Sequence, residues 1–372
     1  MLDHVDYTSL DRAKQEFIAA SRRTLRFAEA FGFVVNPDLG ASANIFSLDL
    51  RPFLKVGAEH LHVCLLPEGL GTADDARPDD LAPDEELQFW HNIGVKTVSC
   101  LTNDAASSGM QTILLGLYLP SSTPERLFHP VFMKGFLDGF VDACRKVACV
   151  YIAGETPQLT GKLVEDKLDI AGALFGLIPP GKTPITGERL DAGHHIVFVE
   201  SSGTHENGFT TLRKMARDLP QGYRTRFPSG QEFWQAINVP GHLYTGLIQE
   251  LMSVIAPVKV EPITGHGWLK LMRSRKNLRY VIEDCLPVPE LFSFLQKQFK
   301  ISTQEMLTIF NYGVGLAIYT DSLSDAEVAV KKARDLGYQA CIAGKIEASS
   351  RRELLVKPWG IHLEGDSFGL VQ

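Results

Sequence analysis

Residues 197–212 read VFVESSGTHENGFTTL, an apolar run followed by small polar residues and then by a helical pattern. The apolar run 197–199 is β-branched or aromatic, which predicts the end of a buried strand. Residues 201–205 contain no large apolar side chain, and Gly208 opens a stretch with helical spacing. A strand, a small-residue loop and a helix start suit phosphate, because they gather backbone N–H groups at a helix N-terminus. Such a segment is more often only a turn, so the chemistry depends on the rest of the chain.

Other loops of small residues follow strands or end helices elsewhere in the chain. They are AGETPQLTG at 153–161, DIAG at 169–172, GVKTVSCLTNDAASSG at 94–109, ITGHG at 263–267 and MLTIFNYGVG at 306–315. In this order, and with the SSG-x-H-x-NG run, these stretches resemble motifs of the aminoimidazole ribonucleotide synthase family. These enzymes are the phosphoribosylformylglycinamidine cyclo-ligases of purine biosynthesis. The resemblance extends over roughly residues 40–370 and identifies the chain as a member of that family.

The resemblance implies an α/β (α+β) fold with two similar mixed α/β domains. It also implies that the sheet of the N-terminal domain forms a barrel with a second copy, which makes the protein a homodimer. The stretch IPPGKTP at 178–184 is the best boundary, since three prolines and a glycine continue neither a helix nor a central strand. We therefore expect domains at 1–182, carrying the ATP-side motifs and dimerisation strands, and at 183–372.

The apolar patterns predict individual elements. In the first half we expect a helix over 7–31, strands at 45–48 and 56–66, a loop over 72–85, a helix at 136–147 and strands at 113–119 and 149–152. In the second half we expect helices at 209–219, 242–255, from 282 onward and at 325–336. Strands there are expected up to 205, at 258–263, 315–320 and 339–346, with a terminal hairpin over 353–371.

Composition agrees with a globular metabolic protein. The 372 residues are 45% hydrophobic and 22% charged, enough for two cores. A net charge of −7 argues against a nucleic-acid binder with a broad basic face. Six scattered cysteines without a C-x-x-C pair indicate free thiols in a reducing compartment. With neither a signal-peptide pattern nor a membrane-spanning run, we expect a soluble cytoplasmic protein that binds neither membrane nor nucleic acid.

The family's reaction implies ATP and Mg²⁺. ATP activates a formyl-amide oxygen, and an amidine nitrogen then displaces phosphate to close the imidazole ring. Such phosphoryl transfer needs magnesium held by carboxylates and N–H donors around the phosphate. The resemblance gives Glu68, Asp104 and Glu155 as magnesium ligands, whereas their ordinary interpretation is solvated carboxylates on a helix or in loops.

The resemblance also assigns further site residues. Catalytic roles fall to Glu155, His205 and Asn207. Residues at the nucleotide or substrate phosphates are Gly69, Gly71, Thr72, Asn103, Asp104, Gly154, Ser202, Gly203, Gly208, Thr264 and Gly265. We expect the loop 201–208 to bind phosphate through backbone N–H groups, with His205 and Asn207 facing a cleft between the domains.

Several departures from the family pattern lie on the ATP side. Ala73 stands where the TDG-x-GTK motif has its lysine, so a phosphate cation is absent there. Leu117 replaces the acidic residue of the FFLDYF strand, which removes a carboxylate from the expected metal cluster. The stretch 42–46 (SANIF) replaces a glycine-rich loop. His242 and His266 also replace family residues, and a lone histidine is more often structural than catalytic.

Two hypotheses follow. In the first, the protein is an ATP-dependent ligase that converts formylglycinamidine ribonucleotide to aminoimidazole ribonucleotide, or a close relative of that enzyme. In the second, it is a non-catalytic or altered-substrate paralogue that binds a phosphorylated metabolite as a dimer. Convergence of Glu68, Asp104 and Glu155 within ligand distance of one metal ion would favour the first hypothesis. If these side chains point to different surfaces, the enzyme hypothesis fails.

Overall fold

The computed structural model describes residues 7–35 and 44–365, and its contacts divide the chain into two compact units. Unit 1 comprises Met1–Ala105 and Met110–Gly181, and unit 2 comprises Ala106–Gly109 and Lys182–Gln372. All six cysteines are free. Among the described residues, no helix combines the length and apolar character that spanning a bilayer requires.

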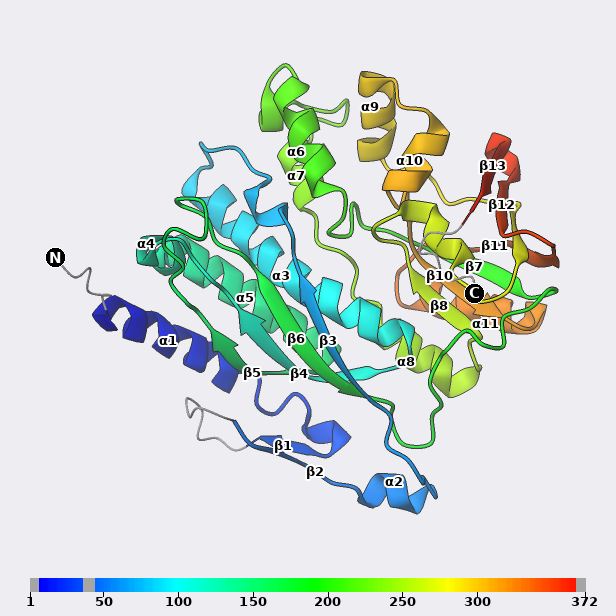
Figure 1. The fold of residues 1–372 in the computed structure, drawn as a ribbon, viewed down its shortest axis with the longest axis horizontal. Coiled ribbons are helices and arrows are strands. Elements are labelled where there is room, and N and C mark those ends of the chain that lie inside the picture. Colours follow the sequence, from blue (N-terminus) through cyan, green and yellow to red (C-terminus); the bar gives the residue numbers. More distant parts are fainter. Residues whose placement is uncertain (1–6, 36–43, 366–372) are drawn as a thin grey trace. The chain divides into compact units, whose positions relative to one another are not determined.

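Unit 1 mixes helices with a short strand pair and one larger sheet (Figure 1). The helices are α1 (Tyr7–Arg22), α2 (Arg51–Lys55), α3 (Pro83–Ser107), α4 (Pro124–Phe128) and α5 (Pro130–Val147), with 3₁₀ turns η1 (Glu29–Phe31) and η2 (Ala73–Asp75). The strands are β1 (Phe33–Val35), β2 (Phe46–Leu48), β3 (Val63–Gly69), β4 (Gln111–Tyr118), β5 (Val150–Glu155) and β6 (Ala171–Leu177).

The larger sheet of unit 1 has the order β3-β6-β4-β5, in which β4 and β5 are parallel and β6 is antiparallel to both β3 and β4. The C-terminal ends of strands β3, β4 and β5 therefore all lie at the same end of the sheet. The sheet is open in the described part of one chain, with β3 and β5 at its sides.

Helices α3 and α5 lie on one face of this sheet and pack closely together (Figure 1). Two glycines permit the close approach. A Cβ on Gly94 would lie 2.2 Å from the carbonyl oxygen of Phe136, and one on Gly139 would lie 1.9 Å from that of His91. Neither distance is possible for a side chain, so the helix pair depends on both glycines.

Unit 2 contains a sheet with more strands and a similar mixture of helices. The helices are α6 (Phe209–Asp218), α7 (Phe233–Asn238), α8 (Thr245–Val254), α9 (Glu290–Phe299), α10 (Thr303–Ile309) and α11 (Leu323–Asp335), with η3 (Gly222–Arg224), η4 (Gly267–Met272) and η5 (Lys357–Trp359). The strands are β7 (His195–Glu200), β8 (Lys259–Pro262), β9 (Leu278–Ile282), β10 (Val314–Thr320), β11 (Ala340–Ala348), β12 (Glu353–Val356) and β13 (Ile361–Glu364).

Strand β7 lies inside the sheet of unit 2, whose order is β13-β12-β9-β11-β7-β10-β8. Its side chains alternate between two buried faces, as the period of a strand requires. Val197 and Val199 join the core that α8 and α11 complete, whereas Phe198 packs against Trp268 of η4 with ring centroids 5.1 Å apart. Burial on both faces explains the continuous apolar run in the sequence.

The mixed α/β class is confirmed, and several expected elements need correction. The helix expected over 7–31 ends at Arg22. The strand expected at 56–66 begins only at Val63, because α2 occupies 51–55 and Gly57 turns the chain with φ of 70°. The helix expected from 282 is wrong: 278–282 form β9, paired with β11 and β12, and α9 starts at Glu290. The stretch 42–46 lies partly outside the described residues.

Candidate functional site

Three of the motif loops meet at one end of the unit 2 sheet. Strands β7 and β8 end there, and β10, which is antiparallel to both, begins there. We call residues 201–208, 263–267 and 310–313 the unit 2 loop cluster. The three segments correspond to the SSG-x-H-x-NG, ITGHG and FNYG stretches, which are distant in the sequence.

Asn311 connects these loops from the inside. Its Oδ1 accepts hydrogen bonds from the hydroxyl of Ser201 at 3.0 Å and from the backbone N–H of Gly313 at 3.1 Å. Its Nδ2 donates to the carbonyl oxygen of Gly203 at 2.7 Å, and the carbonyl of Asn311 accepts from the indole of Trp268 at 2.8 Å. The residue is 2% exposed. Asn311 therefore fixes the shape of the cluster, a role that the sequence assigned to no residue.

The loop 201–208 has an unusual backbone. His205 and Glu206 adopt left-handed conformations with φ of 47° and 62°, and Gly208 follows with φ of 76°. Two consecutive non-glycine residues in this region cost about 1–2 kcal/mol each. The Glu206 carboxylate stabilises the turn, because its Oε1 accepts a hydrogen bond from the N–H of Gly241 at 2.8 Å. Strain retained in a loop that the rest of the fold supports is typical of functional sites.

His205 lies in the interior of unit 2 and is 3% exposed. Its Nε2 accepts a hydrogen bond from the backbone N–H of Ser202 at 3.0 Å, which assigns the proton of the neutral ring to Nδ1. The ring contacts His242 and Tyr244, with centroids 5.9 and 5.8 Å away. Burial lowers the pKa of His242. The imidazole of His205 thus supports the loop, and its role at a substrate stays a prediction.

The remaining predicted residues of unit 2 lie in the same cluster. A Cβ on Gly265 would lie 3.4 Å from Oδ1 of Asn207, so these two predicted residues are neighbours. Nδ2 of Asn207 donates to the carbonyl of His205 at 2.5 Å. The hydroxyl of Thr264 accepts a hydrogen bond from the ammonium of Lys270, a buried cation.

Glycine is required at position 208 of this cluster. A Cβ there would lie 2.5 Å from the ring of Phe310, and φ is positive. The hydroxyl of Ser202 donates to the carbonyl of Pro240, and Gly203 is held by Asn311. All predicted unit 2 residues are therefore local neighbours, on loops that the fold holds together.

Several predicted residues of unit 1 lie at the same end of the sheet, but on different strands, so they do not meet at one point. Glu68, Gly172, Leu117 and Gly154 form one row across strands β3, β6, β4 and β5. Gly69 and Glu155 lie at the two ends of the next row. Three spacings of about 4.8 Å separate the outer strands, so Glu68 and Glu155 are about 14 Å apart along the sheet. Leu117, which is 4% exposed, lies on a strand between them.

The third carboxylate, Asp104, is on α3 beside Asn103, which is 6% exposed. Among the described residues, Glu68, Asp104 and Glu155 do not bring their ligand atoms within 4.8 Å of one another. The residues of one chain therefore do not fit a magnesium ion held by all three carboxylates.

The loop after β3 differs from its expected form. Gly71 has φ of 67°, and Thr72 precedes η2 with a buried hydroxyl that has no hydrogen-bond partner. Ala73 is buried, and Asp74 is 4% exposed. Burial, together with the neighbouring charge of Asp75, raises the pKa of Asp74 to about 7. No sequence pattern indicates this buried carboxyl group.

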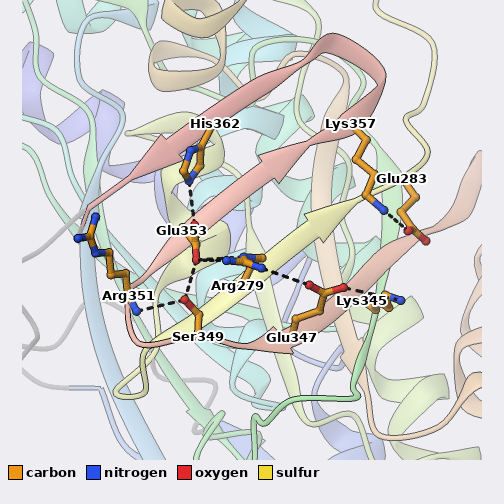
Figure 2. Close-up of polar contacts among 9 residues, drawn as sticks. All are labelled: Arg279, Glu283, Lys345, Glu347, Ser349, Arg351, Glu353, Lys357 and His362. Atoms are coloured by element: carbon orange, nitrogen blue, oxygen red, sulfur yellow. Dashed lines mark hydrogen bonds and ion pairs between the residues drawn. The ribbon is translucent and has the colours of Figure 1, made fainter.

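Among the described residues, a group of possible metal ligands is found on the hairpin β12–β13 of unit 2 (Figure 2). Glu353, His362 and Glu364 have ligand atoms within 4.8 Å of one another. Glu353 already accepts hydrogen bonds from Arg279 at 3.0 Å, Ser349 at 2.6 Å and His362 at 2.9 Å. These contacts compensate its charge, so the group is an ion-pair network that ties the hairpin to β9.

Comparisons with known proteins agree with the resemblance to the aminoimidazole ribonucleotide synthase family. Residues 80–178 match the family described as AIR synthase related protein, N-terminal domain. The phosphoribosylformylglycinamidine cyclo-ligase of Bacillus cereus (strain Q1) is 28% identical over 262 residues, covering 68% of this chain and 73% of that protein. The cyclo-ligase of Bacillus pumilus (strain SAFR-032) is 27% identical over 269 residues, with the same coverage.

Solved structures resemble the fold at low sequence identity. The hydrogenase maturation protein HypE of E. coli has a TM-score of 0.61 at 19% identity, covering 95% of this chain and 96% of that chain. Thiamine-monophosphate kinase from Stenotrophomonas maltophilia K279a has a TM-score of 0.60 at 16% identity, covering 92% and 97%. The fold and its loops thus define an AIR synthase-like α/β protein. The chain is similar to members of the aminoimidazole ribonucleotide synthase family over about two thirds of its length.

Proposed function

We propose that this protein is an ATP-dependent ligase of the cyclo-ligase type, which converts formylglycinamidine ribonucleotide to aminoimidazole ribonucleotide. The observation that carries the proposal is the unit 2 loop cluster, in which three motif loops meet around Asn311. Small residues and the N-terminus of α6 suit a substrate phosphate. The relatives named phosphoribosylformylglycinamidine cyclo-ligase supply the reaction.

ATP is the proposed co-substrate. A HypE structure that resembles this fold with a TM-score of 0.59 was determined in complex with ATP. The nucleotide-side residues of the proposal are those at the strand ends of unit 1, including Gly69, Gly71 and Gly154. Glu155 remains a proposed catalytic residue, at the end of β5.

The direct test is turnover. The purified protein is incubated with formylglycinamidine ribonucleotide and magnesium-ATP, and phosphate release and aminoimidazole ribonucleotide are measured. We expect one phosphate released for each imidazole formed, and no release without the ribonucleotide. Binding of the ribonucleotide without any turnover would contradict the ligase assignment.

A second candidate function is binding without this turnover, by a non-catalytic or altered-substrate paralogue. The separation of Glu68 from Glu155 by the width of the sheet favours it, as does Ala73 in the loop after β3. Under this alternative, calorimetry detects ribonucleotide binding while the turnover assay stays negative.

A homodimer through the edge strand β3 forms part of both candidates. Leu61, Val63 and Leu65 are 38%, 48% and 77% exposed, and Tyr118 is 42% exposed. Leu114 is instead buried inside unit 1. An exposed apolar edge strand is usually covered by a partner. We expect Leu65→Glu to convert the dimer to a monomer in sedimentation, whereas Val164→Glu, at a position that is 74% exposed, leaves it unchanged.

The proposed domain division follows the two units, with the boundary among the prolines of 178–184. Gly181 ends unit 1 and Lys182 continues unit 2. Limited proteolysis should cut this stretch and release two resistant fragments. Cleavage spread evenly over both halves would contradict the division.

A further inference from the structure

The hairpin β12–β13, at one side of the unit 2 sheet, places two carboxylates directly opposite each other. Glu353 of β12 is the register partner of Glu364 of β13, so both side chains lie on the same face of the hairpin. His362 is two residues before Glu364 on β13 and shares that face. Like charges in a directly opposite pair destabilise a sheet. A cationic group between the two carboxylates would therefore stabilise the hairpin.

The imidazole of His362 lies between these carboxylates. Its Nε2 is 2.9 Å from Oε2 of Glu353 and 3.6 Å from Oε1 of Glu364. The ligand atoms of the three residues all lie within 4.8 Å of one another. Two ligands of a tetrahedral zinc ion, each about 2.1 Å from the metal, are about 3.4 Å apart. The two distances from Nε2 lie on either side of that value, so small side-chain movements would place the three atoms around one ion.

The other oxygen of each carboxylate is held from outside this group. Oε1 of Glu353 accepts hydrogen bonds from the hydroxyl of Ser349 at 2.6 Å and from Nε of Arg279 at 3.0 Å (Figure 2). Oε2 of Glu364 lies 3.6 Å from the guanidinium of Arg351. Each carboxylate thus has one oxygen beside a neighbouring donor and presents the other to the imidazole. Outer contacts of this kind orient the carboxylates that ligate metals in proteins.

Exposure and ligand chemistry indicate which ion fits. The side chains of His362 and Glu364 are 45% and 50% exposed, so an ion can enter from solvent, whereas that of Glu353 is 8% exposed. One imidazole and two carboxylates are ligands of zinc, whereas magnesium and calcium take six or more ligands, which are oxygens. The two carboxylates also balance the charge of a divalent ion.

We propose that Glu353, His362 and Glu364 form a zinc site on the hairpin β12–β13. The ion takes the place of the proton between Nε2 of His362 and Oε2 of Glu353, and that proton is released to solvent. Water completes the tetrahedral coordination. The contacts to Oε1 of Glu353 persist, so the ion fastens β13 to β12 and, through Arg279, to β9. The site requires neither ATP nor the ribonucleotide, and it does not rest on the proposed function.

The test is zinc binding by the full chain after treatment with a chelator. Titration calorimetry with zinc chloride should detect a binding step in the wild-type protein. His362→Gln and Glu364→Gln should each weaken this step at least about tenfold, because each variant loses a ligand atom. Magnesium chloride should give no such step. Magnesium binding as tight as that of zinc would overturn the assignment.

The matched control is His129→Gln, at an exposed histidine of unit 1 that precedes α5. It should keep the zinc affinity of the wild type. Zinc held elsewhere in the chain, for example by thiols, gives the same signal in every variant. The hairpin site is therefore measured by the step that the two hairpin variants lose and the control keeps.

Thermal unfolding separates the loss of a ligand from the loss of the fold. Zinc should raise the melting temperature of the wild type and of His129→Gln more than that of either hairpin variant. Without zinc, Glu364→Gln should melt close to the wild type, because an exposed ion pair contributes little. This variant tests the site even if His362→Gln fails to fold. A wild type that does not bind zinc, or equal affinity and equal stabilisation in all four proteins, would overturn the proposal.

Discussion

The two units hold their motif loops in different ways. In unit 2, loops from three distant parts of the chain share one buried asparagine and become close neighbours. In unit 1, Glu68 and Glu155 lie on the two outer strands of an open sheet, and the carboxyl group of Asp74 is buried just after the turn that follows β3. Motif resemblance therefore locates loops reliably, but the strand register decides which side chains meet.

The largest expected effect comes from Asn311. Replacing it by alanine leaves the hydroxyl of Ser201, the N–H of Gly313 and the carbonyl of Gly203 without their partner. We expect the free energy of unfolding to fall by about 3–5 kcal/mol, as for loss of a buried hydrogen-bond network. Chemical denaturation measures it.

The matched control is Asn277→Ala, at an exposed asparagine of the same unit that donates to the carbonyl of Ser350. This variant should lose well under about 1 kcal/mol. Equal stability of the two variants would mean that the unit 2 loop cluster is not organised by Asn311.

In unit 1, replacing the buried carboxyl group of Asp74 should raise the free energy of unfolding, whereas replacing Asn311 should lower it. The folded-state pKa of Asp74 is about 7, raised from 3.8. Its burial therefore opposes folding once pH exceeds the unfolded-state value, and increasingly so up to about pH 7. At pH 8 we expect Asp74→Asn to be more stable than the wild type by about 2–4 kcal/mol. Thermal unfolding at several pH values measures the difference.

The gain should shrink as the pH falls and vanish below about pH 3, where aspartate is largely protonated in both states. A difference that is independent of pH would show that the asparagine acts through packing. The control is Asp79→Asn, at an exposed aspartate that follows η2 in the same unit. Its stability should match that of the wild type at every pH, because a substitution at a solvated side chain changes stability little.

The hairpin network of Figure 2 predicts a smaller effect in unit 2. Hydrogen bonds from Ser349, Arg279 and His362 hold the pKa of Glu353 below its ordinary value of 4.5. The side chain is 8% exposed, so its charge contributes to stability above the unfolded-state pKa. We expect Glu353→Gln to lose about 1–2 kcal/mol at pH 7.

That loss should disappear as the pH falls through the lowered pKa of Glu353, since both proteins then carry a neutral group. Glu364→Gln is the comparison variant, at a hairpin carboxylate that is 50% exposed, and it should lose less. Equal losses in the two variants would contradict the central place of Glu353 in the network.

Much of the fold was predictable because its strands and long helices carry clear apolar periods. The run 197–199 marked β7, and the apolar stretch 136–147 marked the second half of α5. Residues 278–282 were missed as a strand, because a short apolar run fits either a helix or a strand until its neighbours are known. Those neighbours, β11 and β12, come from later in the chain.

The site was predictable only as loops. The sequence identified the segments that contain Ser202, Thr264 and Gly265, and the structure brings those segments together. It did not identify Asn311, whose importance depends on three partners, two of them far away in the sequence. It also did not indicate that the row from Glu68 to Gly154 crosses the whole sheet.

The most direct test of the proposed phosphate site in unit 2 is binding of aminoimidazole ribonucleotide, the proposed product, to the wild-type protein and to Asn207→Asp. Asn207 lies beside Gly265 in the unit 2 loop cluster, so a carboxylate there should repel a bound phosphate. Calorimetry should show binding to the wild type, affinity at least about tenfold weaker in Asn207→Asp, and no change in Asn277→Asp. Absence of wild-type binding, or equal affinity in all three proteins, would contradict the proposal that this cluster holds the substrate phosphate.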